Sequence, residues 1–275
     1  MRIGMGQMLV EGGASVANLN RAVALIQQAA DAGCELVVLP ECLDLGWTWP
    51  EARNLARPIP GERSDRLAAA AKKHGIWVVA GLTERDADKV FNCAILISSA
   101  GDVIAKHRKI NELAIAHHLY DVGDRIAAVS SPFGSIGVTI CADNFPDSLV
   151  FGHALARMGV RTLLSPCAWA VDADHDNTKE PYGDLWLTAY RRLASLYDMN
   201  VVGVSCVGWL AGGPWKGRKC IGNSMAVGPG GRILAVAPYG VDAECLTVVE
   251  LATAAPIARG GDFADALKER GYTGP

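Results

Sequence analysis

The regular alternation of apolar strand-like runs with amphipathic helices restricts the fold of this chain more than any other feature. Leu19, Val23 and Ile26 lie three or four positions apart, which predicts a helix over residues 15–33 with one buried face. The run Glu35-Leu36-Val37-Val38-Leu39-Pro40 is apolar at four consecutive positions, which predicts a strand buried on both faces. Such pairs recur along the chain, and this favours sheets covered by helices.

The same order of elements occurs in both halves of the chain, without a repeat of individual residues. The predicted strands are 3–9, 35–40, 76–82, 90–98, 102–109, 135–141, 162–166, 201–207, 222–228, 232–238 and 244–251; the predicted helices are 15–33, 62–74, 147–158, 183–198 and 262–270, and 167–181 is a predicted loop. Two such halves predict an α/β fold with two sheets packed face to face between outer helices, a four-layer α-β-β-α sandwich. No linker-like composition divides the 275 residues, so we expect one domain over 1–275.

The composition narrows the class of protein. The formal net charge is −3, with Lys and Arg scattered, which indicates neither a nucleic-acid surface nor a membrane surface. No apolar stretch reaches the roughly 18 residues that cross a bilayer, and Met1–Gln7 is predicted to be a strand and not a signal peptide. The eight cysteines form no CxxC pair and lie mostly in apolar runs. They therefore predict free thiols in a reducing, cytoplasmic compartment.

Cys141 is the candidate nucleophile. It follows the apolar run 135–140 and precedes Ala142-Asp143-Asn144-Phe145-Pro146-Asp147, a pattern that predicts a strand, a tight turn and a helix that begins near Pro146. A cysteine at such a junction lies beside orienting backbone N–H groups and can act as a nucleophile. The alternative is a buried structural thiol, since free cysteine is among the most buried residue types.

Two charged residues also follow predicted strands. Glu41 ends the strand 35–40, and Lys109 ends the strand 102–109. Taken singly, Glu41 is equally well explained as a capping or salt-bridged acid, and Lys109 as a solvated surface lysine. Together with Cys141 they lie at the edge where open α/β sheets place ligands. A carboxylate, an ammonium and a thiol are a complete set for acyl transfer, as base, oxyanion stabiliser and nucleophile.

The motifs Leu39-Pro40-Glu41, His107-Arg108-Lys109-Ile110 and Ile140-Cys141-Ala142-Asp143-Asn144-Phe145-Pro146 occur in the order in which the nitrilase superfamily, the carbon–nitrogen hydrolases, carries them. The chain resembles that superfamily from about Ile3 to Leu251. The resemblance implies an α-β-β-α fold without metal or organic cofactor, a homodimer or higher homo-oligomer, and a small-molecule substrate. It also implies a Glu41, Lys109 and Cys141 triad, a thioester or thioimidate intermediate, and a backbone N–H at Ala142 that assists Lys109.

The chain departs from the family in two places. Many members have a second glutamate between the lysine and the cysteine, but the family spacing counted back from Gly123-Asp124 lands on Ala116. Glu112 is the candidate auxiliary carboxylate, with a solvated loop acid as the alternative. Nitrilases typically have Trp-Glu after the cysteine, where this chain has Ala142-Asp143, and this favours amide or N-carbamoyl substrates over nitriles.

Four side chains are candidate substrate contacts. Asn144 and Phe145 follow the nucleophile closely, and Asn144 is alternatively a helix N-cap. Trp169 follows the strand 162–166, and Trp47 follows Glu41; each is alternatively a packing residue.

Other polar groups fit known sites less well. The cluster Asp172-Ala173-Asp174-His175-Asp176 has the spacing of neither a zinc site nor a calcium loop. His117-His118 or His153 would be needed for a cysteine–histidine enzyme, and nothing in the sequence places either beside Cys141. Residues 212–219 form a basic, glycine-rich segment without P-loop spacing, which is either an exposed loop or a contact to an acidic group or a partner subunit.

The sequence therefore predicts an enzyme that hydrolyses a small amide or N-carbamoyl compound. A nitrilase and a non-catalytic binding module on the same fold are the alternatives. An activated Cys141 is expected to react with alkylating agents faster than the other seven cysteines at neutral pH.

Overall fold

A computed structural model describes residues 1–253 and 255–274. It contains two six-stranded mixed sheets and one small sheet. The first large sheet has the order β15 (Cys245–Glu250), β1 (Arg2–Gln7), β2 (Leu36–Val38), β3 (Trp77–Asp86), β4 (Lys89–Ile97), β5 (Val103–Arg108). The second has the order β14 (Arg232–Val236), β13 (Met225–Gly228), β10 (Asn200–Ser205), β8 (Thr162–Cys167), β7 (Gly134–Val138), β6 (Ala128–Ser131). The small sheet has the order β11 (Val207–Trp209), β12 (Lys219–Ile221), β9 (Ala170–Val171).

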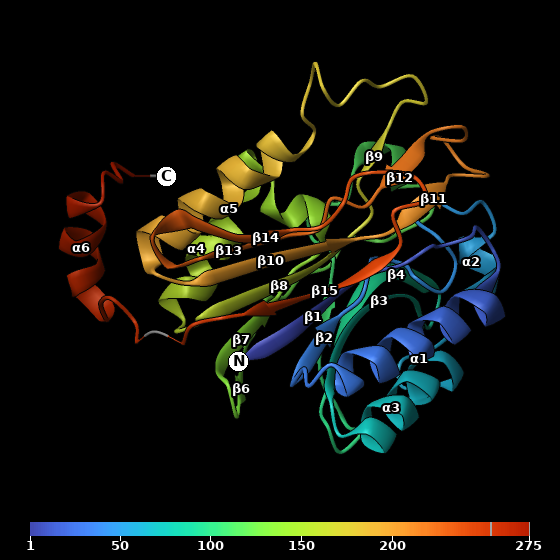
Figure 1. Cartoon of the computed structure of the whole chain (residues 1–275), viewed down its shortest axis with the longest axis horizontal. Helices are drawn as coiled ribbons and strands as arrows, with labels where there is room; N and C mark the ends of the chain where they lie inside the picture. The colour runs from blue at the N-terminus through green and yellow to red at the C-terminus, as the bar shows by residue number, and fades with distance from the viewer. Residues whose placement is uncertain (254, 275) are drawn as a thin grey trace.

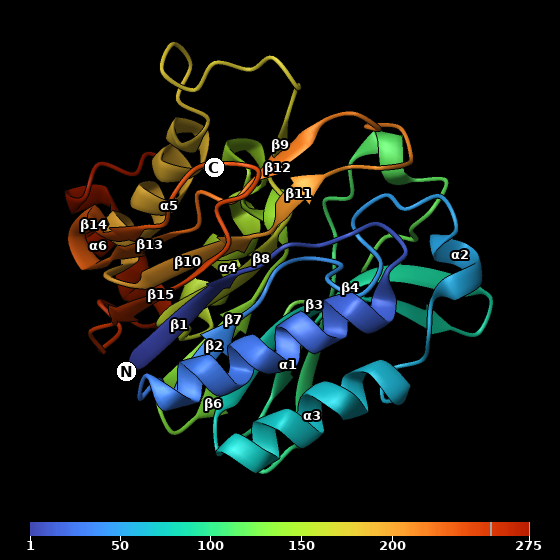
Figure 2. The same cartoon turned by 45° about the vertical axis from the view of Figure 1, so that its right-hand side comes forward.

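Helices cover the outer face of each large sheet (Figures 1 and 2). On the first sheet lie α1 (Ser15–Asp31) and α3 (Glu62–His74), and on the second lie α4 (Val150–Arg157) and α5 (Gly183–Tyr197). The short helices α2 (Ala52–Leu55) and α6 (Phe263–Glu269) lie at opposite ends of the molecule in Figure 1. The predicted four-layer α-β-β-α sandwich is therefore confirmed.

Alternation within the strands builds both sides of the first sheet. Leu36 and Val38 of β2 pack between the two sheets, whereas Val37 packs under the helices. In β3, Trp77 likewise packs between the two sheets and Val78 packs under the helices. Side chains of a strand point alternately to its two faces, so apolar residues at every position are needed when both faces are covered.

The helix α3 shows how the sequence ends an element. It ends at Gly75, whose φ of 65° is in the left-handed region and whose N–H caps the carbonyls of Ala71 and Lys72. Glycine adopts this conformation without steric cost, so the chain turns there into β3.

Several predicted boundaries were wrong. The strand predicted at 135–141 ends at Val138, and the helix predicted at 147–158 is a 3₁₀ turn, Pro146–Ser148, followed by α4. The predicted loop 167–181 contains β9. The strand β11 begins where the predicted strand 201–207 ends, and β12 lies just before the predicted strand 222–228. The short elements α2 and β6 were not predicted. Two- to four-residue elements leave no periodicity to detect, because tertiary pairing stabilises them. Among the described residues, no helix combines the length and the apolar character that a bilayer crossing requires.

Candidate active site

Glu41, Lys109 and Cys141 lie beyond the carboxyl ends of strands in the two sheets. Glu41 comes three residues after β2, Lys109 directly after β5, and Cys141 three residues after β7. The strand β5 is antiparallel to β4, which is antiparallel to β3, so β5 runs in the same direction as β2 and β3. The two sheets stack, and this edge therefore collects residues from both of them.

The loop that carries Glu41 is packed tightly on β3. Gly81 donates its N–H to the Pro40 carbonyl at 3.0 Å and accepts the Leu43 N–H at 2.9 Å. A Cβ at Gly81 would lie 2.5 Å from Cα of Glu41, so only glycine allows this approach. Glu41 also donates its N–H to the carbonyl of Cys167 in the second sheet, at 3.2 Å. The carboxylate is thus fixed from both sheets.

Glu41 and Lys109 form a buried ion pair. Nζ of Lys109 is 2.8 Å from Oε1 of Glu41 and 3.6 Å from Oε1 of Glu112, and the side chains of Lys109 and Glu41 are each only 1% exposed. Asn92 of β4 donates Nδ2 to the same Oε1 of Glu41 at 2.6 Å. The structure therefore brings Glu112, the candidate auxiliary carboxylate, into contact with Lys109 and not to the solvent.

The charges of this cluster hold Lys109 as an ammonium. Burial alone would lower the pKa of Lys109, but the negative charges of Glu112 and Glu41 outweigh it and keep the pKa well above its usual value. Burial raises the pKa of Glu112, and the Lys109 charge opposes that rise. Oε2 of Glu41 is buried and has no hydrogen-bond partner among the described residues, so one oxygen of this carboxylate is available for a proton.

Cys141 lies at a strained turn. Its φ of 43° is left-handed, which is uncommon for a residue with a side chain, and it begins the 3₁₀ helix Cys141–Asn144. Its N–H donates to Oγ of Ser165 at 3.0 Å, and the residue is 9% exposed. The turn begins three residues after β7, whereas the sequence analysis extended the strand to Cys141.

The surroundings of Cys141 disfavour its thiolate form. Burial, the contact with the Cys167 thiol and the negative charge of Glu41 together raise its pKa well above the usual value, and the positive charge of Lys109 opposes them only in part. Its nucleophilicity therefore depends on transfer of the proton to a base and not on a stored thiolate. This weighs against the expected selective alkylation of Cys141 at neutral pH, because the more exposed Cys245 competes for such reagents.

Asp143 holds the nucleophile turn against the lysine loop. Its carboxylate accepts Nε2 of His107 at 2.7 Å and the N–H groups of Asn111 at 2.7 Å, Ile110 at 3.1 Å and Ile140 at 2.9 Å. Burial alone would raise the pKa of Asp143, but the His107 contact and these N–H donors keep it below its usual value. We did not assign a role to Asp143 or His107 from the sequence. The available signal was a histidine and an aspartate inside two of the three quoted motifs.

The two residues after Asp143 face different neighbours. Nδ2 of Asn144 donates to Oγ1 of Thr139 at 3.0 Å and to Oγ of Ser165 at 2.9 Å, and the residue is fully buried. Its amide therefore supports the turn of Cys141. The Phe145 ring lies against Trp186 of α5, with ring centroids 5.0 Å apart.

Tryptophan side chains surround the cluster on two sides. Trp169 stacks on Trp186 with centroids 4.8 Å apart, and both side chains are buried. The Trp47 ring lies 5.5 Å from Nζ of Lys109 and meets the edge of Trp215 at 5.0 Å. Trp215 belongs to the basic segment 212–219, so part of that segment packs near the buried cluster.

The other polar groups considered in the sequence contact partners outside the proposed triad. Asp172 pairs with Arg218 at 2.8 Å, and Asp176 pairs with Lys179 at 3.3 Å. Nε2 of His117 is 3.0 Å from the Glu112 carbonyl, and Nδ1 of His153 is 2.7 Å from the Tyr197 hydroxyl. Within residues 1–253 and 255–274, no group of three or more His, Cys, Asp or Glu side chains is arranged to hold a metal ion.

Comparison with known proteins assigns the family. Residues 3–258 match the carbon-nitrogen hydrolase family, and the chain belongs to it, as the three motifs predicted. Among curated relatives, a nitrilase of Pyrococcus abyssi is 30% identical over 226 residues, 80% of this chain and 78% of that protein. Omega-amidase NIT2 of Xenopus tropicalis is 33% identical over 170 residues. That alignment covers 55% of this chain and only 58% of the omega-amidase.

Solved structures share the fold. The NitN amidase from Nesterenkonia sp. AN1 superposes with a TM-score of 0.78 at 22% identity, over 98% of this chain and 96% of that one. Nit3 of Saccharomyces cerevisiae superposes with a TM-score of 0.76 at 26% identity, over 90% and 88% of the two chains.

Proposed function

We propose that this protein hydrolyses the carbon–nitrogen bond of a small amide or N-carbamoyl compound, with Glu41, Lys109 and Cys141 as the catalytic residues. Glu41 takes the thiol proton of Cys141 while sulfur attacks the carbonyl carbon. The oxygen that becomes negative is stabilised by the ammonium of Lys109 and by the N–H of Ala142, the first amide after the nucleophile. The C–N bond then breaks, and the leaving amine takes the proton that Glu41 holds.

The second half of the reaction releases the acid. Water attacks the thioester carbon while Glu41 takes one of its protons, and the same oxyanion contacts stabilise the tetrahedral intermediate. The C–S bond breaks, the acid leaves, and the proton returns to the sulfur of Cys141. Glu112 and Asn92 hold Lys109 and Glu41 in place through both halves.

The observation that carries this proposal is the asymmetry of the Glu41 carboxylate. Oε1 receives both Lys109 and Asn92, whereas Oε2 is buried without a partner. A buried oxygen without a partner is unfavourable for stability and is explained by a proton that moves there during turnover. The raised pKa of the Cys141 thiol fits the same scheme, because a protonated thiol requires such a base.

The test is ammonia release from simple amides, N-carbamoyl amino acids and nitriles. Cys141→Ala is expected to abolish release while circular dichroism shows an unchanged fold, and Cys34→Ala, at a cysteine outside the cluster, is expected to retain it. Release from nitriles alone would replace the proposal by a nitrilase, the activity named for the Pyrococcus relative. Wild-type activity in Cys141→Ala would refute the mechanism.

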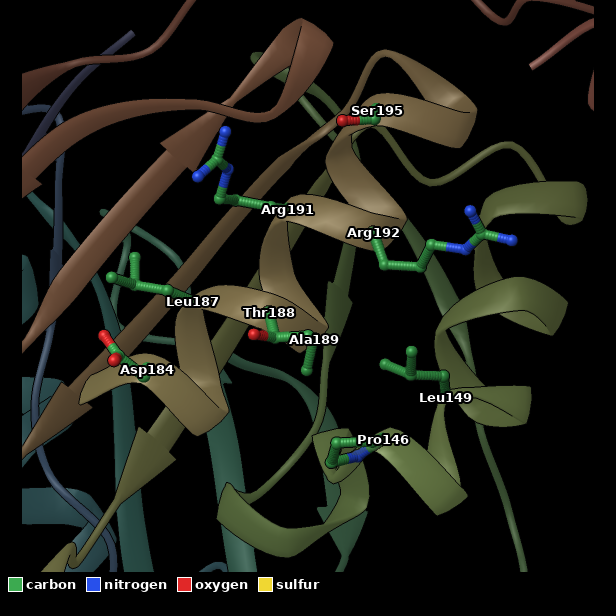
Figure 3. Close-up of a pocket in the computed structure, with 9 residues that line it drawn as sticks. All are labelled: Pro146, Leu149, Asp184, Leu187, Thr188, Ala189, Arg191, Arg192 and Ser195. Atoms are coloured by element: carbon green, nitrogen blue, oxygen red, sulfur yellow. The ribbon is translucent and has the colours of Figure 1, made fainter. Parts of the chain in front are cut away.

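We also propose that the protein is a homodimer or a higher homo-oligomer. A surface groove of about 670 Å³ runs between α5 and the segment 146–149, with Leu149 and Leu187 in its walls (Figure 3). Val150 of α4 and Leu185 of α5 are further exposed apolar side chains. None of the proposed catalytic residues lines this groove, so it is a candidate contact between copies and not the substrate site.

Two further assignments remain proposals. All eight cysteines fall within the described residues and are free thiols, which supports a reducing, cytoplasmic location. The family match over residues 3–258, and the packing of Phe263 of α6 on Tyr197 of α5, support one domain over 1–275.

A further inference from the structure

A second buried thiol, at Cys167, lies in the candidate active site and has no part in the proposed reaction. Cys167 is the last residue of β8, and its carbonyl accepts the N–H of Glu41. Its sulfur is 3.2 Å from the Ser165 carbonyl and 3.9 Å from the Tyr190 hydroxyl. These contacts place it between the base loop of the first sheet and the nucleophile turn of the second.

The pairing of β7 with β8 brings the turn that follows β7 towards Cys167. The two strands are parallel, with Val138 aligned with Leu164. Three residues further along each chain are Cys141 and Cys167. Oγ of Ser165 accepts the N–H of Cys141 at 3.0 Å and lies 3.6 Å from Sγ of Cys167, so one hydroxyl contacts both residues. The two thiols also contact each other directly, as a disulfide between them requires.

We propose that Cys141 and Cys167 are a reversible modification site, in which a peroxide oxidises Cys141 and Cys167 closes a disulfide with it. The inference rests on the proposed acid–base pair of Glu41 and Cys141. Glu41 takes the thiol proton, and the sulfur attacks one oxygen of the peroxide, which breaks the O–O bond and gives a sulfenic acid. The leaving hydroxide takes the proton from Glu41 and departs as water.

The second step uses the Cys167 thiol. Its sulfur attacks the sulfur of the Cys141 sulfenic acid, the S–O bond breaks, and the hydroxyl leaves with the thiol proton as a second water. In total, two thiols and one hydrogen peroxide give one disulfide and two waters. The disulfide blocks the nucleophile, and it also prevents oxidation to sulfinic acid, which ordinary thiols do not reverse.

The other buried cysteines differ from Cys167 in their surroundings. The thiol of Cys42 contacts the Tyr120 hydroxyl at 3.9 Å, and that of Cys93 contacts the Ala94 carbonyl at 3.7 Å. Cys206 directly precedes β11, Cys220 lies in β12, and the two thiols contact each other. That pair does not include the proposed nucleophile, and Cys206→Ser is therefore the matched control.

The experiment exposes the whole protein to a few equivalents of hydrogen peroxide. Remaining thiols are then alkylated under denaturing conditions, and the peptides are mapped by mass spectrometry. We expect a peptide pair joined through Cys141 and Cys167, with the loss of two hydrogens, and its disappearance on treatment with dithiothreitol. The map reads the bond directly, and ammonia release by untreated protein tests the proposed function separately.

Activity recovery tests the role of Cys167. In the wild type and in Cys206→Ser, dithiothreitol is expected to restore most of the activity lost to peroxide, relative to each untreated protein. In Cys167→Ser and Cys167→Ala, recovery is expected to fall several-fold, with Cys141 found as sulfinic or sulfonic acid. The proposal is overturned if wild-type peptides show no Cys141–Cys167 bond, or if the Cys167 variants that retain the wild-type circular dichroism recover as fully as the wild type.

Discussion

Two glutamates pair with neighbouring cations at the end of β5, and they differ in how their oxygens are used. Glu84 accepts Lys106 at 2.5 Å and Arg108 at 3.0 Å through Oε1, and Arg108 again at 2.7 Å through Oε2. Glu41 accepts Lys109 and Asn92 through Oε1 and nothing through Oε2. The two pairs are built from adjacent residues, Arg108 and Lys109, yet one carboxylate is saturated with donors and the other is not.

The difference separates an ion pair that stabilises the fold from one suited to chemistry. Burial alone would raise the pKa of Glu84, but Arg108 and Lys106 outweigh it and keep the pKa below its usual value, so this carboxylate resists protonation. Glu41 retains a free oxygen, and its charge helps to raise the pKa of the Cys141 thiol. Both glutamates are buried and paired with cations. The candidate base, Glu41, differs from Glu84 in having one oxygen that accepts no hydrogen bond from any described residue.

Exchanging each glutamate for glutamine is the strongest way to break this comparison. Glu41→Gln is expected to reduce turnover on the order of 10²- to 10⁴-fold, because an amide cannot take the thiol proton. Glu84→Gln is expected to change turnover by less than about threefold and to lower the free energy of unfolding by about 1–3 kcal/mol. Steady-state ammonia release and urea unfolding measure the two effects. Equal losses of turnover in the two variants would contradict the assignment.

The two cations allow the same contrast. Lys109→Met is expected to lower kcat by about a hundredfold or more, because it removes an oxyanion donor. Arg108→Met is expected to act mainly on stability, since it leaves Glu84 with Lys106 alone. Kinetics on variants with wild-type circular dichroism provide the measurement. A loss of less than about threefold in Lys109→Met would remove Lys109 from the proposed role.

Glu112 is expected to have a smaller effect than Lys109, because it acts through that residue. Glu112→Gln weakens the contact that positions the Lys109 ammonium. Because a displaced catalytic group is less effective, we expect kcat of this variant to fall about tenfold. KM is expected to change little. A variant with unchanged kcat would show that Asn92 and Glu41 suffice to hold Lys109.

Asp143 is a third buried carboxylate, and its contribution to stability is expected to depend on pH. Its pKa is below the usual value in the folded protein, so the stability that its charge provides is present above about pH 4 and is lost as the pH falls through the lower folded-state pKa. Asp143→Asn is expected to be about 1–3 kcal/mol less stable at pH 7, with the difference shrinking in acid. Urea unfolding at several pH values, with the exposed Asp174→Asn as control, measures this. A difference that stays constant with pH would contradict it.

The sequence was sufficient for the layers of the fold and for the edge at which the site lies. Long elements such as α1 and the apolar run before Glu41 carry their own periodicity, and strand ends follow from it. The small sheet was missed because β9 and β12 contain two or three residues each and depend on pairing across long sequence separations.

Within the candidate site, the sequence placed charges but not their partners. The sequence identifies Glu41, Lys109 and Glu112 as candidates. It does not show that Lys109 and Asn92 both contact one oxygen of Glu41 and leave the other oxygen free. Asp143 contacts residues of both the lysine loop and its own turn, a set that no local pattern specifies. The partners of the Asn144 amide, Thr139 and Ser165, could not be predicted either, because the packing of β7 on β8 defines them.

Glycine adopts the left-handed backbone of Cys141 without the steric cost of a side chain, which is about 1–2 kcal/mol. The most relaxed version of this turn is therefore one that lacks the thiol. Selection for thermostability alone would favour glycine at position 141 and yield a robust but inactive protein. Any programme of directed evolution on this scaffold consequently needs a turnover screen at every round, because heat resistance and catalysis oppose each other at this one position.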